Sequence, residues 1–163
     1  MRYSLKACGL GTALAFAVFA PRAIAEELTY TWTCQGVGVS QPEAIGDHDG
    51  HSISVSTDSC HSESGLMNGA VLTGTTIWEW DGPKATLLSS NGVIRKPGAT
   101  AVYQNSEGSF AMTIADGKPT GFTASGKGDE KLATGSLASL SGKPYTWTAK
   151  SSAPGQFVIE VKQ

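Results

Sequence analysis

All three histidines of the chain fall within a stretch of 14 residues, together with several carboxylates. Neutral imidazole and carboxylate groups are ligands that bind Zn²⁺, Cu²⁺ or Ni²⁺, and three or four of them must converge on one ion. The segment therefore indicates a candidate site for a divalent metal. Its candidate ligands are His48, His51, His61, Asp47 and Asp49.

The spacing of these residues matches no established zinc motif. His48 and His51 would share one face of a helix, but Gly50 lies between them and disfavours helix formation. Asp, His and Gly are also common in solvated turns, so an ordinary loop is the competing interpretation. His61 joins the site only if a disulfide at Cys60 brings it close to the loop.

Large apolar side chains that recur along the chain form a second candidate site. A β-barrel of eight strands is wide enough either to fill its interior with side chains or to hold one small ligand. The sequence leaves both possibilities open. The candidate cavity residues are Trp32, Trp78, Trp80, Phe110, Met112, Phe122 and Trp147, with Ile114 and Phe157 as further members.

Patterns for hydrolysis or nucleotide binding are missing or incomplete. The chain has no Gly-x-Ser-x-Gly elbow. The segment Gly121 to Gly128 resembles a phosphate-binding loop but ends in glycine where a hydroxyl is needed for Mg²⁺. Glu79 lies between Trp78 and Trp80, and it faces solvent if the two tryptophans face inward. The sequence therefore assigns no catalytic residue.

Period-two alternation dominates the chain from residue 28 onward and predicts β-strands. In Leu28–Cys34, aromatic residues and the cysteine face one side and threonines face the other. A long strand is expected over Ala70–Trp80. Further strands are expected near 53–55, 85–89, 93–95, 100–104, 109–115, 120–125, 144–150 and 156–162.

Turn residues separate these segments at short intervals. Asn91-Gly92 and Asp116-Gly117 are two-residue signals for hairpins. Glycines within the alternating segments, at Gly74, Gly121 and Gly135, are typical of the sharp bends of small barrels. Together these features predict an all-β fold, a single antiparallel barrel of eight or nearly eight strands.

The C-terminal half carries a glycine-rich pattern. It consists of Gly126-Lys127-Gly128, Ala133-Thr134-Gly135, Leu140-Ser141-Gly142-Lys143 and the segment Tyr145 to Trp147. This pattern resembles bacterial exported proteins grouped with the allene oxide cyclase barrel-like fold, which are small lipocalin-shaped barrels. The resemblance covers about residues 65–163 and implies an eight-stranded barrel with an apolar interior. It permits an isomerase or cyclase activity inside the barrel but assigns no residue to it.

The first 25 residues have the composition of a secretory signal peptide. Arg2 and Lys6 precede the apolar run Ala7–Ala20, and Ala23-Ile24-Ala25 is a small-x-small cleavage site. Fourteen apolar residues are too few to span a bilayer, which needs about 20. We therefore expect residues 26–163 to form the mature barrel domain, periplasmic or secreted, with no stable membrane span after cleavage.

Cleavage also changes the cysteine count and the charge. It removes Cys8 and leaves Cys34 and Cys60, which an oxidising compartment is expected to join in a structural disulfide. It also removes three of the 12 basic residues, so that nine oppose 14 acidic residues and the net charge becomes −5. A protein with this charge is not expected to bind nucleic acid.

The sequence favours an exported, non-catalytic barrel that binds a small apolar ligand or serves as a structural or interaction module of the cell envelope. The alternative is a periplasmic protein that binds a divalent metal through the His/Asp loop. A third possibility is an isomerase or cyclase that acts in the barrel cavity. No cofactor is expected beyond the metal of the second interpretation, and the sequence does not predict an oligomeric state.

Overall fold

The computed structural model describes residues 28–38 and 41–163, so the predicted signal peptide lies outside the described residues. No helix in these ranges is long and apolar enough to cross a membrane. The strands are β1 (Thr29–Gly36), β2 (Glu43–Ala44), β3 (His51–Ser62), β4 (Ala70–Asp81), β5 (Lys84–Lys96), β6 (Ala99–Ala115), β7 (Lys118–Ala133), β8 (Lys143–Ala153) and β9 (Gln156–Lys162), and the 3₁₀ helices are η1 (Gly65–Met67) and η2 (Gly135–Leu140).

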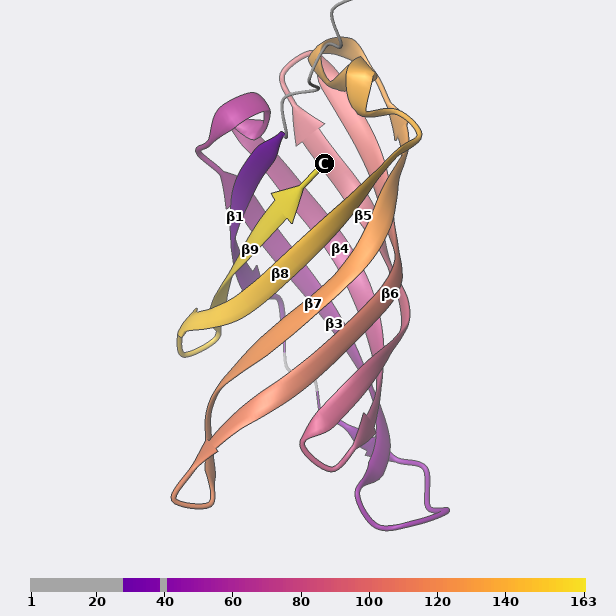
Figure 1. The fold of residues 1–163 in the computed structure, drawn as a ribbon, viewed down its shortest axis with the longest axis vertical. Coiled ribbons are helices and arrows are strands. Elements are labelled where there is room, and N and C mark those ends of the chain that lie inside the picture. The colour runs from indigo at the N-terminus through magenta and orange to yellow at the C-terminus, as the bar shows by residue number, and fades with distance from the viewer. Residues whose placement is uncertain (1–27, 39–40) are drawn as a thin grey trace, which may run out of the picture.

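Eight of these strands close into an antiparallel barrel (Figure 1). Each strand from β3 to β8 pairs with the next along the chain, and β9 pairs with β1. The pairing of β1 with β3 closes the sheet. The two-residue strand β2 adds to the same edge of β3, further along it. The predicted all-β, eight-stranded antiparallel barrel is therefore confirmed, with one additional short strand.

Cys34 and Cys60 form the predicted disulfide. The two residues are direct register partners in the β1–β3 ladder, and both are buried. This ladder contains only four residue pairs, which makes it the shortest seam among the eight barrel strands. The disulfide therefore links the two strands covalently at the seam where hydrogen bonding is least extensive.

The two ends of the barrel differ (Figure 1). One end holds η1, η2 and the C-terminus, and we call it the capped end. The apolar side chains of Met67, Leu137 and Leu140 are buried there and plug the barrel. The other end holds the β4–β5, β6–β7 and β8–β9 hairpins, and we call it the hairpin end.

The prediction of a hairpin at Asn91-Gly92 is wrong, because both residues lie within a strand. The segments predicted as separate strands at 85–89 and 93–95 are one continuous strand, β5. A Cβ atom at Gly92 would collide with the ring of Tyr103 and with the backbone of β4. The glycine therefore allows close packing inside the barrel and does not form a turn.

The other turn signal, Asp116-Gly117, does form a hairpin, between β6 and β7. Both residues have positive φ, 51° and 73°, as the tight hairpin turn requires. Gly74 and Gly121 lie within strands as predicted. Gly135 does not: it begins η2 with φ of 59°, a conformation that favours glycine.

Candidate functional site

The barrel encloses a cavity with a volume of about 370 Å³. Small-molecule sites in proteins range from roughly 300 to 1,000 Å³, so the cavity has the size of a ligand site. Every residue predicted to face a cavity lines it, apart from Ile114. The lining includes Trp32, Trp78, Trp80, Phe110, Met112, Phe122, Trp147 and Phe157.

Ile114 is a correction to that prediction. Its side chain is 47% exposed and does not line the cavity. The ladder between β6 and β7 shifts register between Thr113 and Ile114, close to the hairpin tip. Ile114 therefore lies beyond the part of β6 in which alternate residues point into the barrel.

Aromatic side chains form a continuous chain of contacts around the cavity. The rings of Trp78 and Trp80 both contact Phe110, with centroids 5.6 and 4.9 Å apart. Phe110 stacks on Phe122 at 4.6 Å, and Phe122 contacts Phe157 at 5.7 Å. Apart from Trp80, these rings are only partly buried, so the apolar wall remains accessible to solvent.

Glu130 adds a polar group to this wall that the sequence prediction did not include. Its side chain is 1% exposed and lines the cavity. The Tyr30 hydroxyl donates a hydrogen bond to Glu130 Oε1 at 3.3 Å. Glu130 Oε2 has no hydrogen-bond partner among the described residues, and the same holds for Trp147 Nε1. The cavity lining thus includes a carboxyl group with one buried oxygen that has no donor.

Asp58 is a second carboxyl group on the cavity lining. Burial raises the pKa of Asp58 to about 6, and burial likewise raises the pKa of Glu130 to about 7. The hydrogen bond from Tyr30 opposes the rise in the pKa of Glu130 without cancelling it. Both groups therefore change charge near neutral pH.

The other titratable groups of the lining are phenols. Burial is the main cause that raises the pKa values of Tyr30, Tyr103 and Tyr145, and the charge of Glu130 adds to the rise for all three. These phenols stay neutral throughout the physiological range. None of the described lining residues is Lys, Arg or His. The charge of the cavity is therefore set by two acids.

Strand alternation explains why Glu130 faces inward. Positions 122, 124, 126, 128 and 130 of β7 all face the interior: Phe122, Ala124 and Glu130 line the cavity, while added Cβ atoms at Gly126 and Gly128 would meet Trp147 and Tyr145. The strand predicted at 120–125 ends five residues before Glu130, whereas β7 continues to Ala133. Extending the same alternation by five residues would have identified Glu130.

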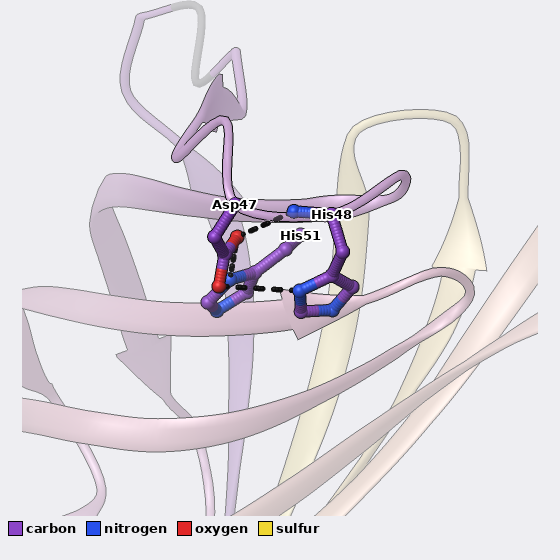
Figure 2. A group of neighbouring side chains, drawn as sticks. All are labelled: Asp47, His48 and His51. Carbon is purple, nitrogen blue, oxygen red and sulfur yellow. Dashed lines mark hydrogen bonds and ion pairs between the residues drawn. The ribbon is translucent and has the colours of Figure 1, made fainter.

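A second cluster lies outside the cavity, where the loop after β2 meets β3 (Figure 2). Asp47, His48 and His51 place one potential ligand atom each within 4.8 Å of one another. Asp47 Oδ1 lies 2.6 Å from His51 Nδ1, and Asp47 Oδ2 lies 3.2 Å from His48 Nδ1. The two imidazole rings stack with centroids 4.6 Å apart. The structure thus brings together three of the five predicted metal ligands.

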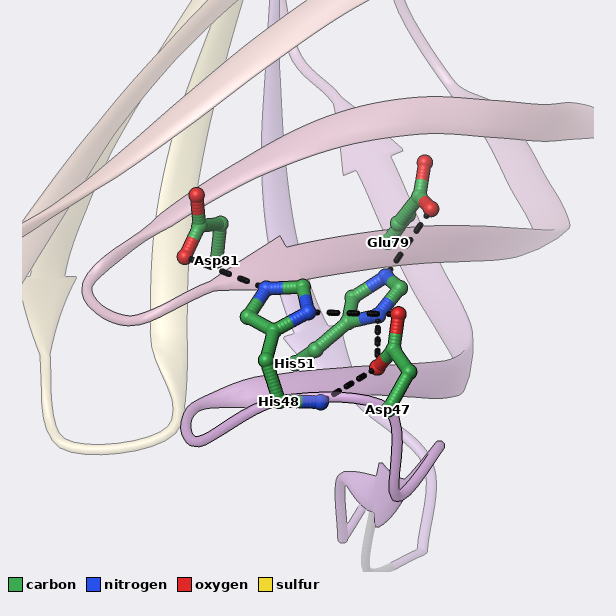
Figure 3. A network of polar contacts seen from close by, with 5 residues as sticks. All are labelled: Asp47, His48, His51, Glu79 and Asp81. Atoms are coloured by element: carbon green, nitrogen blue, oxygen red, sulfur yellow. Dashed lines mark hydrogen bonds and ion pairs between the residues drawn. The ribbon is translucent and has the colours of Figure 1, made fainter.

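Strand β4 contributes two further carboxylates to this cluster (Figure 3). Glu79 Oε1 lies 3.0 Å from His51 Nε2, and Asp81 Oδ1 lies 3.9 Å from His48 Nε2. Both ring nitrogens of His51 therefore face carboxylates, which suits a protonated imidazolium with two N–H donors. The hydrogen bond to Asp47 is the main cause that raises the pKa of His51, and the same bond lowers the pKa of Asp47 to about 2.

His61 and Asp49 do not join the cluster. His61 lies ten residues along β3 from His51, about 33 Å at the usual rise of ~3.3 Å per residue. The disulfide does hold Cys60 against β1, but at the part of β3 remote from the loop. Asp49 is exposed and supplies no atom to the cluster found in the described ranges.

No protein-family model and no curated protein matches this chain. Membership of the allene oxide cyclase barrel-like family therefore stays a prediction. The barrel architecture itself is established by the strand pairing. The two sites differ in what they can do: the cavity can enclose an organic molecule, and the surface cluster can hold a proton or a metal ion between imidazole and carboxylate groups.

Proposed function

We propose that this protein is an exported, non-catalytic barrel that binds a small, largely apolar ligand in its cavity. The single observation that supports this proposal most strongly is the cavity of about 370 Å³ with its aromatic wall. Export rests on the predicted signal peptide, which places the barrel in the periplasm or outside the cell.

The cavity offers enough apolar surface for useful affinity. A ligand that removes about 250 Å² of apolar surface from water gains roughly 6 kcal/mol before the costs of association are subtracted. The aromatic chain from Trp78 to Phe157 is already assembled by its own ring contacts. A ligand therefore enters a site whose walls need little rearrangement.

A neutral fluorescent apolar probe, N-phenyl-1-naphthylamine, tests this function by titration. We expect the probe to bind with an increase in its emission and with quenching of tryptophan emission. Ala124 lines the cavity, and the substitution Ala124→Phe is expected to weaken binding by roughly ten-fold or more, because the added ring occupies ligand space.

The neighbouring substitution Thr123→Phe provides the matched control, since Thr123 is exposed one residue earlier on the same strand. It adds a ring of similar size outside the cavity and should leave probe affinity unchanged. Equal affinity of the Ala124→Phe variant and the unaltered protein would contradict the proposal, as would a folded protein that binds no probe.

A second candidate function is binding of a divalent metal at the surface cluster. The close approach of the three ligand atoms from Asp47, His48 and His51 supports it. Titration with Zn²⁺ should show one site that the double substitution His48→Ala/His51→Ala removes. His61→Ala is the matched control, because His61 lies at the far end of β3. Unchanged zinc affinity in the double variant would exclude this site.

A further inference from the structure

The polar groups on the cavity lining indicate which ligands the cavity selects. Glu130 Oε2 is buried without a hydrogen-bond partner among the described residues. Leaving a buried carboxylate oxygen unpaired is unfavourable, so native structures almost always supply a partner. Since the side chain lines the cavity, the missing donor is expected to come from the molecule that occupies it.

The neighbouring phenols do not fill this role. Tyr30 already donates its single O–H to Glu130 Oε1. Tyr145 donates to Asn105 Oδ1 at 2.7 Å and so points its proton elsewhere. The register partner of Glu130 on β8 is Lys143, but that side chain is exposed and supplies no hydrogen bond to Glu130 Oε2. Tyr30, Tyr145 and Lys143 therefore leave Glu130 Oε2 without a hydrogen-bond donor.

The charge of the cavity lining indicates that the missing donor is positively charged. Asp58 and Glu130 are both acids, and none of the lining residues in the described ranges is basic. Burial is the main cause that raises the pKa of the Tyr103 phenol, and Asp58 and Glu130 both lie close enough for their charges to add to the rise. The two acids thus act on one region of the cavity, where they repel an anion and attract a cation.

We propose that the ligand carries a protonated amine, which Glu130 binds directly with Asp58 as a second counter-charge, while its apolar body lies against the aromatic wall. This inference rests on the proposed function. An ammonium group supplies several N–H donors and a positive charge, so it satisfies Oε2 and offsets both carboxylates. The apolar wall requires that the cation be an organic amine with a hydrophobic body, and aromatic faces also attract cations.

Three ligands with the same chain and different head groups test this proposal: decylamine, 1-decanol and decanoate. Each is used to displace N-phenyl-1-naphthylamine from the full-length protein at about pH 8, where both carboxyl groups are ionised. We expect decylamine to bind roughly ten-fold or more tightly than 1-decanol, because the charged head group adds a charge-assisted hydrogen bond. Decanoate should bind most weakly.

The substitution Glu130→Gln is expected to lower decylamine affinity by roughly ten-fold while changing 1-decanol affinity by less than about two-fold. Glu63→Gln is the matched control, because Glu63 is exposed beyond the end of β3, and it should change neither. If the Glu130→Gln variant does not fold, Asp58→Asn provides the same comparison and should also lower the affinity for decylamine selectively.

The outcomes separate this inference from the function on which it rests. Equal affinities for decylamine and 1-decanol, or tightest binding of decanoate, would overturn the amine assignment and leave the apolar cavity function standing. An unchanged decylamine affinity in both acid variants would overturn it as well. Failure of all three ligands and of the probe to bind the folded protein would overturn both.

Discussion

Glu130 combines nearly complete burial, a single hydrogen bond and a position on the wall of a cavity. A carboxyl group in this setting destabilises the empty folded protein whenever it is charged, because ionisation is more favourable in the unfolded chain. Carboxyl groups with perturbed pKa values cluster at functional sites. The residue therefore connects the stability of the barrel to its proposed binding function.

The pH dependence of stability tests this view of Glu130. Its pKa is about 7 in the folded protein against an ordinary value of 4.5, so the folded state prefers the protonated form. The stabilisation is complete below about pH 4.5 and is lost as the pH rises through about 7, with a total on the order of 3 kcal/mol. In the Glu130→Gln variant, this part of the pH dependence should disappear.

Urea unfolding at about pH 4 and pH 8 measures this difference, with Glu63→Gln as the exposed control. Asp58 faces the same region and its raised pKa acts in the same direction, so some pH dependence remains in the variant. Tyr30, Tyr103 and Tyr145, which complete the titratable surroundings, stay neutral over this range. If the free energy of unfolding changes equally between about pH 4 and pH 8 in the variant and in the unaltered protein, the pKa of Glu130 is not raised by burial.

The surface cluster shows how far residue spacing alone predicts a site. The density of His and Asp near residue 48 identified Asp47, His48 and His51 correctly as neighbours. The sequence could not reveal that β3 runs straight from His51 to His61, which separates those histidines. It also could not place Glu79 beside His51, because that contact depends on the register between β3 and β4.

At the level of strands, glycines decide how closely the barrel interior packs. Gly74 and Gly92 make room for the Tyr103 ring, and Gly126 and Gly128 make room for Trp147 and Tyr145. Larger side chains at these positions would push the rings into the cavity or distort the ladder. The same residues that look like turn signals in the sequence therefore preserve the volume of the site.

Substitution of one such glycine tests this role. We expect Gly92→Ala to destabilise the protein by about 1–3 kcal/mol, because the new methyl group overlaps Tyr103 and the backbone of β4. Gly36→Ala is the matched control at the end of β1, where an added Cβ meets no atom within 4 Å. Thermal unfolding of both variants measures the difference. A Gly92→Ala variant as stable as Gly36→Ala would contradict the packing explanation.

The strand predictions are nearly right for β4 and too short for β5 and β6. Strand β4 was predicted nearly to its bounds, since Ala70–Asp81 alternates without interruption up to Trp78 and Trp80. Strands β5 and β6 were each divided in two, because Gly92 and the register shift after Asn105 interrupt the pattern. In the closed barrel, side chains still alternate between inside and outside on either side of these positions. This continuity can be recognised only when the pairing of each strand with its neighbours is known.

At the scale of the whole molecule, the barrel is asymmetric along its axis (Figure 1). Apolar side chains of η1 and η2 are buried in the core at the capped end. The Cys34–Cys60 disulfide secures the short β1–β3 seam, and both cysteines face inward beside the cavity or within the core. Closure of the sheet and a rigid wall are the conditions under which a barrel of this size keeps an internal cavity.

A crystal structure of the complex with N-phenyl-1-naphthylamine tests the central claim most directly. The claim predicts that the probe lies inside the barrel, with its rings against Trp78, Phe110 and Phe122, and that the strand pairing is unchanged. In the Ala124→Phe variant, crystallised under the same conditions, the cavity should contain no probe. A probe found only on the outer surface, or a barrel interior filled by rearranged side chains, would contradict it.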